Sequence, residues 1–508
     1  MKTSEGKGKR AVVIGWGLSG RAATAWLAQN GWDVTVLEDD PKAAAAAEAS
    51  GAPVARVADV AQAQAQAAAR LAREADLVVP SPGVRISHPA LVAASHGGVP
   101  IWSEVELAWS ALEGAGGQAR TSALTGARVG LVAITGTNGK TTVTELVTAM
   151  LRNSGTWAVA AGNVGYPLLE AVCNATAGSL RSLAGDGAWP ETGPGSAAPP
   201  GTAVLVAEVS SFQLHYTRSF APDVSCWLNF SPDHLDWHPS LDHYSSAKAR
   251  IWANQKPGTV AVVNADDPVV VERARTIPRG VRVVSFGSPG RERAAPDGAD
   301  ALAAREGWRV YADRIEGPDG TTLEAERLPR AFPHDLANTA AAFAVALAAG
   351  ATPEGCIAGA VSTKAPHHRL ELVGEAGGVS WYDDSKATTP ASVVAAVRGF
   401  RSVVLIAGGR NKGLDLSTLR ETAPPVHAVI AIGESATQVA DAFAGAASTY
   451  TAGSMGAAVR QAASISRPGD AVVLSPGCAS FDWYSSYAER GEDFVALVKE
   501  KLREVQAR

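Results

Sequence analysis

The stretch VGLVAITGTNGKTT, Val129–Thr142, decides the fold of the middle of this 508-residue chain. An apolar run breaks into a glycine-rich loop that ends in Gly-Lys-Thr-Thr, a pattern typical of a buried strand that turns into a helix start. Such a turn presents backbone N–H groups and the positive end of a helix to a polyphosphate. Lys140 is expected to reach the β- and γ-phosphates, and the Thr141 hydroxyl is expected to bind Mg²⁺. The loop therefore predicts a nucleoside triphosphate site, against the alternative of a plain glycine-rich turn.

Length, charge and cysteine content limit the class of protein. A chain of 508 residues suggests about three domains. A formal net charge of −5, without a large basic cluster, argues against nucleic acid as the main partner. Four scattered cysteines without CxxC spacing fit a reducing compartment. No apolar run reaches the roughly 18 residues of a membrane span, so we expect a cytoplasmic protein without membrane insertion. We also expect a monomer.

The order of apolar runs predicts the domain organisation. Over residues 11–110, short apolar runs alternate with alanine-rich amphipathic stretches, which favours βαβ units around a parallel sheet. A composition shift at 113–127 predicts a linker, and KAPHHR at 364–369 predicts a hinge. Segments 175–202 and 288–306 are expected to be insertions with little chemistry of their own. The expected fold is α/β with three domains: a Rossmann-like domain (1–118), a central P-loop ATPase-type domain with a parallel or mixed sheet (119–365), and a Rossmann-like C-terminal domain (366–508).

A second phosphate-binding pattern lies near the N-terminus. GWGLSG, residues 15–20, follows an apolar run and precedes a helical pattern, with Glu38 at the end of the next apolar run. This is the dinucleotide fingerprint in its expected context, so one hypothesis is a pyridine or flavin dinucleotide site. Hydride transfer needs no triphosphate, however, and the chain has a separate triphosphate loop. The alternative is another pyrophosphate, such as a nucleotide sugar.

Acidic, histidine and lysine side chains beyond the phosphate loop are candidates for a metal site. Glu208 ends the apolar run AVLVAE, where a carboxylate beside a phosphate loop is expected to bind Mg²⁺; capping the next turn is the alternative. The spacing of His234, His238 and His243 matches no standard zinc motif. His234 joining a Mg²⁺ shell is the simpler hypothesis, with the other two as solvated turn residues. Lys248 follows on a helix, where a surface lysine is the default interpretation.

Three polar motifs in the last section follow apolar runs. They are DDSKATTP (383–390), IAGGRNKG (406–413) and LSPGCASFDWY (474–484). The carboxyl ends of parallel strands meet at one edge of a sheet, so these motifs are expected to gather there. Their lysines and hydroxyls suit an anionic substrate. Cys478 has no nearby histidine in sequence and is expected to be a small buried residue rather than a nucleophile.

Together these motifs resemble the Mur ligases, the ATP-dependent amide-forming enzymes of peptidoglycan precursor synthesis. TGTNGKTT, the glutamate of AVLVAEVSS, the Asp-His of SPDHLD, the lysine of AKARI, HHRLE and DDSKAT occur in the family's order. The resemblance covers about residues 10 to 505, apart from the two insertions. DDSKAT and LSPGCASFD are similar to the members that add D-glutamate. Folylpolyglutamate synthetases share the middle and last domains but lack the GWGLSG domain.

The resemblance implies a mechanism and its cofactors. ATP would phosphorylate the alanyl carboxylate of UDP-N-acetylmuramoyl-L-alanine, and the amine of D-glutamate would then displace phosphate through a tetrahedral intermediate. Catalysis would consist mostly of positioning and charge neutralisation. ATP and two Mg²⁺ ions are implied, with Lys248 carbamylated, because an ammonium repels Mg²⁺ whereas a carbamate offers it oxygen ligands.

The resemblance also implies site residues, position by position. The implied catalytic residues are Lys140, His234 and Lys248. The implied Mg²⁺ ligands are Thr141, Glu208, His234 and Lys248. The implied ATP contacts are Gly136, Thr137, Asn138, Gly139, Lys140, Thr141, Thr142, Asn338, Arg369 and Asp384. The implied UDP-sugar contacts are Leu18, Ser19, Glu38, Asp39, Ser81, Gly83 and Asn163. The implied D-glutamate contacts are Thr388, Lys412, Ser480, Phe481 and Tyr487.

Two positions depart from the family's pattern, and two other hypotheses stay open. Asp335 stands where the family usually has asparagine, and Asn411 stands where aspartate is frequent. Neither change removes a charge that the mechanism needs. A nicotinamide-dependent oxidoreductase using GWGLSG is one competing hypothesis. A nucleotide-sensing module that kept the fold without catalysis is the other.

Overall fold

The computed structural model describes residues 8–52, 54–55, 61–114, 128–163, 165–177, 203–289, 307–364 and 367–506. The predicted linker at 113–127 and the predicted insertions at 175–202 and 288–306 lie almost entirely outside these ranges. Contacts between Cα atoms divide the chain into two compact units. The first comprises Met1–Phe230, Asp242–Glu324 and Asn338–Thr363, and the second comprises Ser231–Leu241, Ala325–Ala337 and Lys364–Arg508. The last segment of the second unit begins at Lys364, where the predicted hinge also begins.

The first unit begins with a four-stranded sheet in the order β3-β2-β1-β4, in which each strand pair is parallel. The strands of this sheet are β1 (Arg10–Ile14), β2 (Asp33–Leu37), β3 (Val54–Ala55) and β4 (Leu77–Pro80). The helices of this part are α1 (Leu18–Gln29), α2 (Pro41–Ala49), α3 (Ala61–Glu74) and α4 (Pro89–His96). The βαβ alternation predicted from the apolar runs is confirmed.

A nine-stranded sheet in the order β13-β12-β11-β10-β9-β8-β5-β7-β6 forms the rest of the first unit. Its strands are β5 (Val129–Thr135), β6 (Trp157–Gly162), β7 (Ala203–Glu208), β8 (Val224–Trp227), β9 (Val260–Asn264), β10 (Arg282–Gly287), β11 (Gly307–Val310), β12 (Arg314–Glu316) and β13 (Thr322–Glu324). Its helices are α6 (Lys140–Asn153), α7 (Leu168–Ala177), α8 (Ser211–His215), α9 (Leu241–Ala249), α10 (Pro268–Ala274) and α12 (Pro353–Ser362), together with α11 (Pro333–Ala348) from Asn338 onward. All seven residues of β5 are buried, as a central parallel strand covered on both faces requires. Only β11, β12 and β13 pair antiparallel, so the sheet is mixed.

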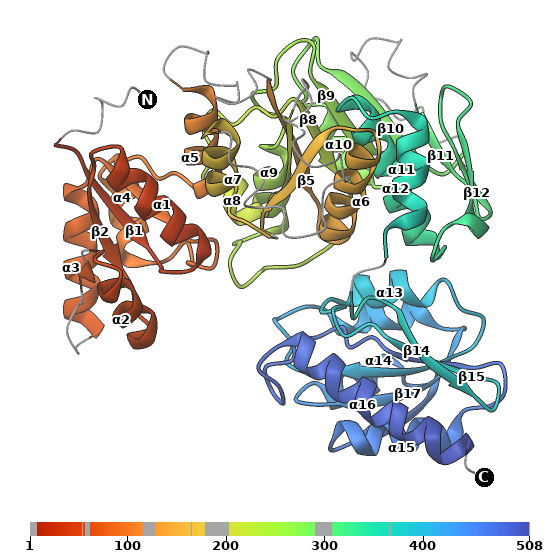
Figure 1. Cartoon of the computed structure of the whole chain (residues 1–508). Helices are drawn as coiled ribbons and strands as arrows, with labels where there is room; N and C mark the ends of the chain where they lie inside the picture. Colours follow the sequence, from red (N-terminus) through yellow and green to blue (C-terminus); the bar gives the residue numbers. More distant parts are fainter. Residues whose placement is uncertain are drawn as a thin grey trace, which may run out of the picture. The chain divides into compact units, whose positions relative to one another are not determined.

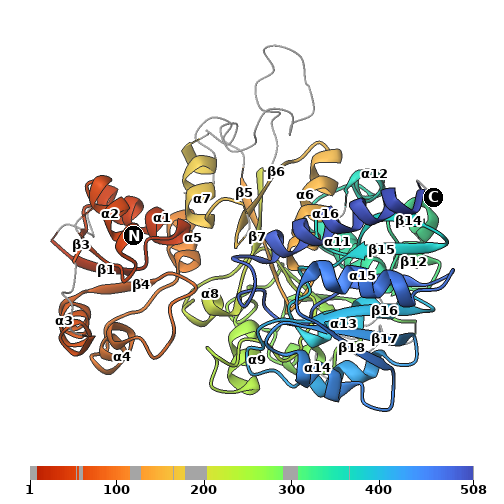
Figure 2. The ribbon, with the colours of Figure 1, turned by 90° about the horizontal axis from the view of Figure 1, so that it is seen from below.

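Helix α5 (Glu104–Glu113) lies in sequence between the two sheets of the first unit and packs against α1 and α7 (Figure 2). It carries two buried carboxylates. Glu106 accepts hydrogen bonds from the backbone N–H groups of Arg218, Ser219 and Phe220 and from the Ser219 hydroxyl. Glu104 Oε1 accepts from Leu169 N at 2.5 Å, whereas Glu104 Oε2 has no hydrogen-bond partner among the described residues. The pKa of Glu104 is raised from 4.5 to about 7, chiefly by burial; the hydrogen bond from Leu169 N opposes the rise and the Glu170 charge adds to it.

Replacing Glu104 by glutamine is expected to stabilise the protein at alkaline pH. Between pH 4.5 and 7 the unfolded chain ionises this carboxyl while the folded chain keeps it protonated, so wild-type stability falls as pH rises through that window. Above pH 7 the cost is constant, on the order of 3 kcal/mol. Glutamine keeps an oxygen for Leu169 N and cannot ionise. Thermal unfolding should show a higher midpoint for Glu104→Gln at pH 8 and a much smaller difference at pH 5.

The matched control is Glu113→Gln, at the partly exposed end of the same helix. It is expected to change the midpoint little at either pH. A Glu104→Gln midpoint below that of the wild type by the same margin at both pH values would show that the carboxylate stabilises the fold in its ionised form.

The second unit is built on a six-stranded sheet in the order β14-β15-β19-β16-β17-β18. Its strands are β14 (Glu371–Ala376), β15 (Val379–Asp383), β16 (Val403–Gly408), β17 (Val426–Ile432), β18 (Ser448–Ala452) and β19 (Ala471–Leu474). Its helices are α13 (Pro390–Val397), α14 (Ala436–Ala442), α15 (Met455–Ile465) and α16 (Tyr487–Gln506), with a 3₁₀ segment at Leu416–Thr422. Strand β14 pairs antiparallel with β15, and the remaining pairs are parallel. Helix α16 runs alongside α15 on one face of the sheet (Figure 1).

A segment from the middle of the chain, Ala325–Ala337, belongs to the second unit. Its Phe332 ring lies 5.0 Å from the Phe400 ring and 6.2 Å from the Tyr382 ring. At Gly399, a Cβ atom would lie 2.3 Å from Phe332 Cδ1, so only glycine fits there. The second unit is therefore discontinuous in sequence.

Candidate active site

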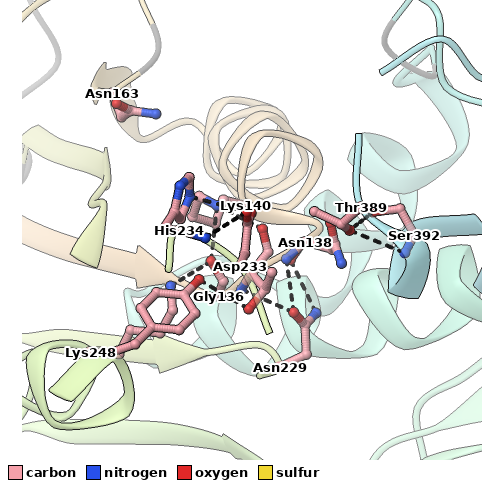
Figure 3. A network of polar contacts seen from close by, with 12 residues as sticks. Gly136, Asn138, Lys140, Asn163, Asn229, Asp233, His234, Lys248, Thr389 and Ser392 are labelled. Atoms are coloured by element: carbon pink, nitrogen blue, oxygen red, sulfur yellow. Dashed lines mark hydrogen bonds and ion pairs between the residues drawn. The ribbon is translucent and has the colours of Figure 1, made fainter. Parts of the chain in front are cut away.

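The loop between β5 and α6 has the geometry of a phosphate cradle (Figure 3). Gly139 has a φ of +81°, and a Cβ there would lie 2.6 Å from Asn338 Oδ1, so the position requires glycine. The loop backbone is fixed from the side by Asn229. Its Oδ1 accepts from Thr137 N at 3.1 Å and from Asn138 N at 2.9 Å, and its Nδ2 donates to Asn138 O at 3.1 Å. Asn229 was not predicted from the sequence, although it follows a buried strand, β8.

Two lysine ammonium groups converge on one carbonyl oxygen of this loop. Lys140 Nζ donates to Gly136 O at 2.9 Å and to Thr137 O at 3.0 Å. Lys248 Nζ donates to the same Gly136 O at 2.8 Å and lies 4.8 Å from the centre of the Tyr244 ring (Figure 3). Lys248 is only 1% exposed, so the default interpretation as a surface lysine is wrong. The loop thus gathers two positive charges at the start of α6, where a polyphosphate would be favoured.

Glu208, the last residue of β7, faces the phosphate loop. Its Oε2 accepts from the Thr141 hydroxyl at 2.8 Å, and its Oε1 accepts from Asn163 Nδ2 at 3.0 Å. The helix after β7 is capped by Ser210 instead, whose Oγ accepts from Gln213 N at 3.3 Å. The capping alternative for Glu208 is therefore wrong.

The donor set around Thr141 fits Mg²⁺ arriving with a nucleotide. A hydroxyl and a carboxylate oxygen lie in contact, and both residues are buried. Among the described residues, no group of three His, Cys, Asp or Glu side chains is placed to hold a metal ion. Mg²⁺ usually takes one or two protein carboxylates and completes its shell with phosphate oxygens and water. The side chains present match that pattern better than an all-protein cage.

The histidine-rich segment belongs to the second unit and differs from expectation. His234 has a φ of +55°, and its Nε2 lies 3.4 Å from Asp233 Oδ2. His238 is 1% exposed and its ring lies 4.5 Å from the Trp237 ring, so it is not a solvated turn residue. His243 lies on α9 in the first unit, with its ring 4.8 Å from that of His215. The part of His234 in a Mg²⁺ shell stays a prediction.

A cavity of about 440 Å³ opens at the carboxyl ends of β1 and β2 and beside the loop after β4. It is lined by Ile14, Gly15, Leu37, Glu38, Asp39, Gly83, Val84, Arg85, Ser87, His88 and Pro89. Three of the predicted UDP-sugar contacts line it: Glu38, Asp39 and Gly83. Three polar residues of the loop after β4 also line it and were not predicted from the sequence: Arg85, Ser87 and His88.

The predicted UDP-sugar residues differ in what they contact within the protein. Glu38 Oε2 accepts from Trp16 N at 2.6 Å and Oε1 accepts from Asp40 N at 2.9 Å, so this carboxylate ties the glycine loop to β2. Ser81 Oγ donates to Gly15 O at 3.2 Å. Leu18 and Ser19 begin α1, and Leu18 is 60% exposed. Asn163 lies with Glu208 rather than in this cavity.

In the second unit, the three polar motifs meet at one edge of the sheet, as predicted, because β15, β19 and β16 are parallel neighbours. Thr388, Lys412 and Ser480 follow these strands. The Ser480 hydroxyl is buried and has no hydrogen-bond partner among the described residues. Phe481 and Tyr487 are 58% and 38% exposed. A buried, unpartnered hydroxyl at this edge is available to a ligand.

Asp384 and Arg369, two predicted ATP contacts, interact electrostatically in the second unit. Asp384 accepts hydrogen bonds from Ser475 Oγ at 2.7 Å and from Leu370 N at 3.3 Å. Burial raises the pKa of Asp384 to about 7, and the Arg369 charge opposes that rise. Burial likewise raises the pKa of Cys478 to about 11, so this thiol stays protonated at neutral pH and is a poor nucleophile.

The two departures from the family pattern have structural roles. Asp335 forms a two-pronged ion pair with Arg330, at 2.6 and 2.7 Å, and accepts from Phe332 N at 3.1 Å. Asn411 Nδ2 donates to Leu414 O and its Oδ1 accepts from Leu414 N, both at 2.9 Å. Asn411 therefore closes the loop that carries Lys412.

Comparison with known proteins covers most of the chain. Residues 9–103 match the "Mur ligase MurD-like, N-terminal domain", residues 134–346 the "Mur ligase middle domain", and residues 368–478 the "Mur ligase, glutamate ligase domain". A relative from Anaeromyxobacter dehalogenans, named UDP-N-acetylmuramoylalanine--D-glutamate ligase, is 38% identical over 99% of this chain and 100% of its own length. A protein of the same name from Frankia casuarinae is 37% identical over 97% of this chain and 94% of its own length.

Solved structures with a similar fold are more distant in sequence. MurF from Acinetobacter baumannii has a TM-score of 0.53 at 17% identity, over 98% of this chain and 92% of that one. A pseudomurein peptide ligase type C from Methanothermus fervidus has a TM-score of 0.53 at 16% identity, over 97% and 99%. These two likenesses support the fold alone.

Proposed function

Because this chain belongs to the Mur ligase family, we propose that it joins D-glutamate to UDP-N-acetylmuramoyl-L-alanine with ATP, in peptidoglycan precursor synthesis. The products would be the amide, ADP and phosphate. The relatives that carry this name match nearly the full length of the chain. The nicotinamide-dependent oxidoreductase gains no support, because the three matching family models are Mur ligase domains and the relatives carry the name of a D-glutamate ligase.

The observation that carries the proposal is the phosphate loop with its charges. Lys140 and Lys248 share the Gly136 carbonyl, and Thr141 contacts the Glu208 carboxylate. A carboxylate is a poor electrophile, so amide formation requires its conversion into an acyl phosphate with a good leaving group. Phosphoryl transfer of this kind depends on positioning and on neutralising negative charge. Asn338, whose Oδ1 lies next to Gly139, would contact the nucleotide as well.

In this scheme the chain's own groups bind and orient the phosphates. The N–H groups at the start of α6 would bind phosphate oxygens, and Lys140 would turn from the loop carbonyls to the β- and γ-phosphates. Thr141 and Glu208 would hold Mg²⁺, which when bound neutralises phosphate charge. By the family resemblance, His234 and a carbamylated Lys248 are the proposed ligands of a second ion, and Arg369 and Asp384 are proposed nucleotide contacts.

The two remaining substrates would occupy the other sites. The cavity of about 440 Å³ suits part of a UDP-sugar, and Arg85 and His88 would add polar contacts to those of Asp39 and Gly83. D-Glutamate would bind at the edge of the second sheet, where Lys412 offers a cation and Ser480 a free hydroxyl. Phe481 and Tyr487 would wall this pocket.

We place the reaction in the cytoplasm and propose a monomer. Four free cysteines suit a reducing compartment, and sedimentation of the purified protein tests the oligomeric state. No helix among the described residues has both the length and the apolar character to cross a bilayer.

Phosphate release against a panel of amino acids tests the proposed function. Release should require both UDP-N-acetylmuramoyl-L-alanine and D-glutamate, because the acyl phosphate needs an amine that fits the pocket. L-Glutamate, L-lysine and diaminopimelate are the comparison substrates. Release that depends on L-lysine or diaminopimelate would move the chain to another ligase of the family, and release without any UDP-sugar would point to a nucleotidase.

A further inference from the structure

We propose that Arg490 is the positioning residue that sets the shape of the amino-acid pocket, an inference that rests on the proposed function of that pocket. Arg490 lies in the first turn of α16 and is 1% exposed. Its Nε donates to Ser385 Oγ at 2.9 Å and its Nη2 to Ser385 O at 2.8 Å. Its Nη1 donates to Cys478 O at 3.1 Å. One planar guanidinium therefore bonds the loops after β15 and after β19 at the same time.

Both loops carry predicted D-glutamate contacts just beyond the bonded residues. Thr388 follows Ser385 on the first loop, and Ser480 follows Cys478 on the second. Five donors in a rigid fork fix the separation of their acceptors better than a flexible ammonium does. The spacing between the Thr388 and Ser480 hydroxyls thus depends on Arg490.

The third loop of the pocket is tied to the same place. Arg410 N donates to Ala479 O at 2.9 Å and Ala479 N donates to Arg410 O at 3.0 Å. At Gly409, with a φ of +132°, a Cβ would lie 2.3 Å from Ala479 O and 3.3 Å from Arg490 Nη1. The loop that carries Lys412 is therefore hydrogen-bonded to Ala479, the residue that follows Cys478. Arg490 bonds the neighbouring Cys478 carbonyl.

Burying the Arg490 guanidinium costs desolvation free energy, which an uncharged side chain of similar size would not. Burial lowers the pKa of Arg490 to about 10, and the charges of Asp482 and Asp383 oppose this effect. The group stays cationic at neutral pH, and its three acceptors are one hydroxyl and two carbonyl oxygens. The charged guanidinium holds the backbone of the loops after β15 and β19. The expected occupant of the pocket that these loops form carries two carboxylates. Among the described residues no hydrogen bond holds the Ser480 hydroxyl in place, so we expect a shift of this backbone to move that hydroxyl.

Steady-state kinetics of Arg490→Lys and Arg490→Met test the proposal. Lysine keeps the charge but cannot reach both loops with a planar fork, and methionine removes charge and donors. The KM for D-glutamate is expected to rise about 10- to 100-fold in both variants, because a buried carbonyl loses its partner and the pocket hydroxyls shift. The KM values for ATP and for UDP-N-acetylmuramoyl-L-alanine should stay within about 3-fold of wild type. Arg503→Lys, at an exposed position of the same helix, is the matched control and should match the wild type.

The wild-type and Arg503→Lys assays report on the proposed function separately. If they release no phosphate with D-glutamate, that function fails, and the same variants are then measured with whichever amino acid supports release. An unchanged KM for the amino acid in Arg490→Lys would overturn the positioning role. So would an equal rise of all three KM values together with a lower unfolding midpoint, which marks general destabilisation. If Arg490→Met does not fold, Arg490→Lys decides the question alone.

Discussion

Replacing Lys140 by alanine is expected to lower kcat for phosphate release by about 1,000-fold. The substitution removes the ammonium group that the phosphate loop itself carries, which bonds Gly136 O, and with it a cation that would neutralise the developing phosphate charge. Lys140 is only half-buried, so the unfolding midpoint should change little. Rates measured at saturating ATP separate the loss of turnover from weaker nucleotide binding.

The control for Lys140→Ala is Lys256→Ala, an exposed lysine of the same unit, which should turn over like the wild type. A rate for Lys140→Ala within about 10-fold of the wild type would mean that the loop does not hold the reacting phosphate. It would also favour the hypothesis of a nucleotide-sensing module over that of a ligase.

Replacing Lys248 by methionine is expected to lower turnover by about 100-fold or more. Methionine matches the length of the buried side chain but cannot react with CO₂ or bind a cation. In the wild type, the neutral amine of Lys248 would add to CO₂ and release a proton, giving a carbamate whose oxygens suit Mg²⁺. Wild-type activity should therefore rise with added bicarbonate and half-saturate at lower Mg²⁺ than Lys248→Met.

A second readout does not depend on activity. Wild-type protein in ¹³C-bicarbonate should show a carbamate carbon signal in its NMR spectrum that Lys248→Met lacks and Lys256→Met keeps. Equal spectra for the wild type and Lys248→Met, with wild-type activity independent of bicarbonate, would contradict the carbamate. Lys248 would then act as the ammonium that bonds Gly136 O in the structure.

Much of the fold could be predicted because its parallel strands are long apolar runs. β5, β7, β16, β17 and β19 are buried throughout or almost so, and polar loops follow them directly. The placement of Glu208 against Thr141 followed from the same logic, since β5 and β7 are parallel neighbours. The short antiparallel strands β12 and β13 were missed, because three residues with one buried side chain each leave no periodic signal.

The missed parts of the sites are charged or polar residues whose environment comes from distant segments. Arg490 lies in a helix rich in charged residues, where the ordinary expectation is a solvated face. Glu104 lies in a helix start, where an acidic residue is commonplace, yet it is buried against Leu169. His238 was expected to be a solvated turn residue, yet it is buried beside Trp237. Whether such a side chain is buried depends on which distant element packs against it. The spacing of residues along the sequence carries no information about that packing.

The discontinuity of the second unit limits how this protein can be dissected. A fragment that starts at the hinge would lack Ala325–Ala337, and with it the Phe332 ring that covers Gly399, Phe400 and Tyr382. It would also lose the donor on Arg330 that bonds the Arg369 carbonyl. Such a piece would carry an exposed aromatic patch and tend to associate. Modular exchange of the second unit between related ligases would therefore have to transplant this internal segment along with the C-terminal region.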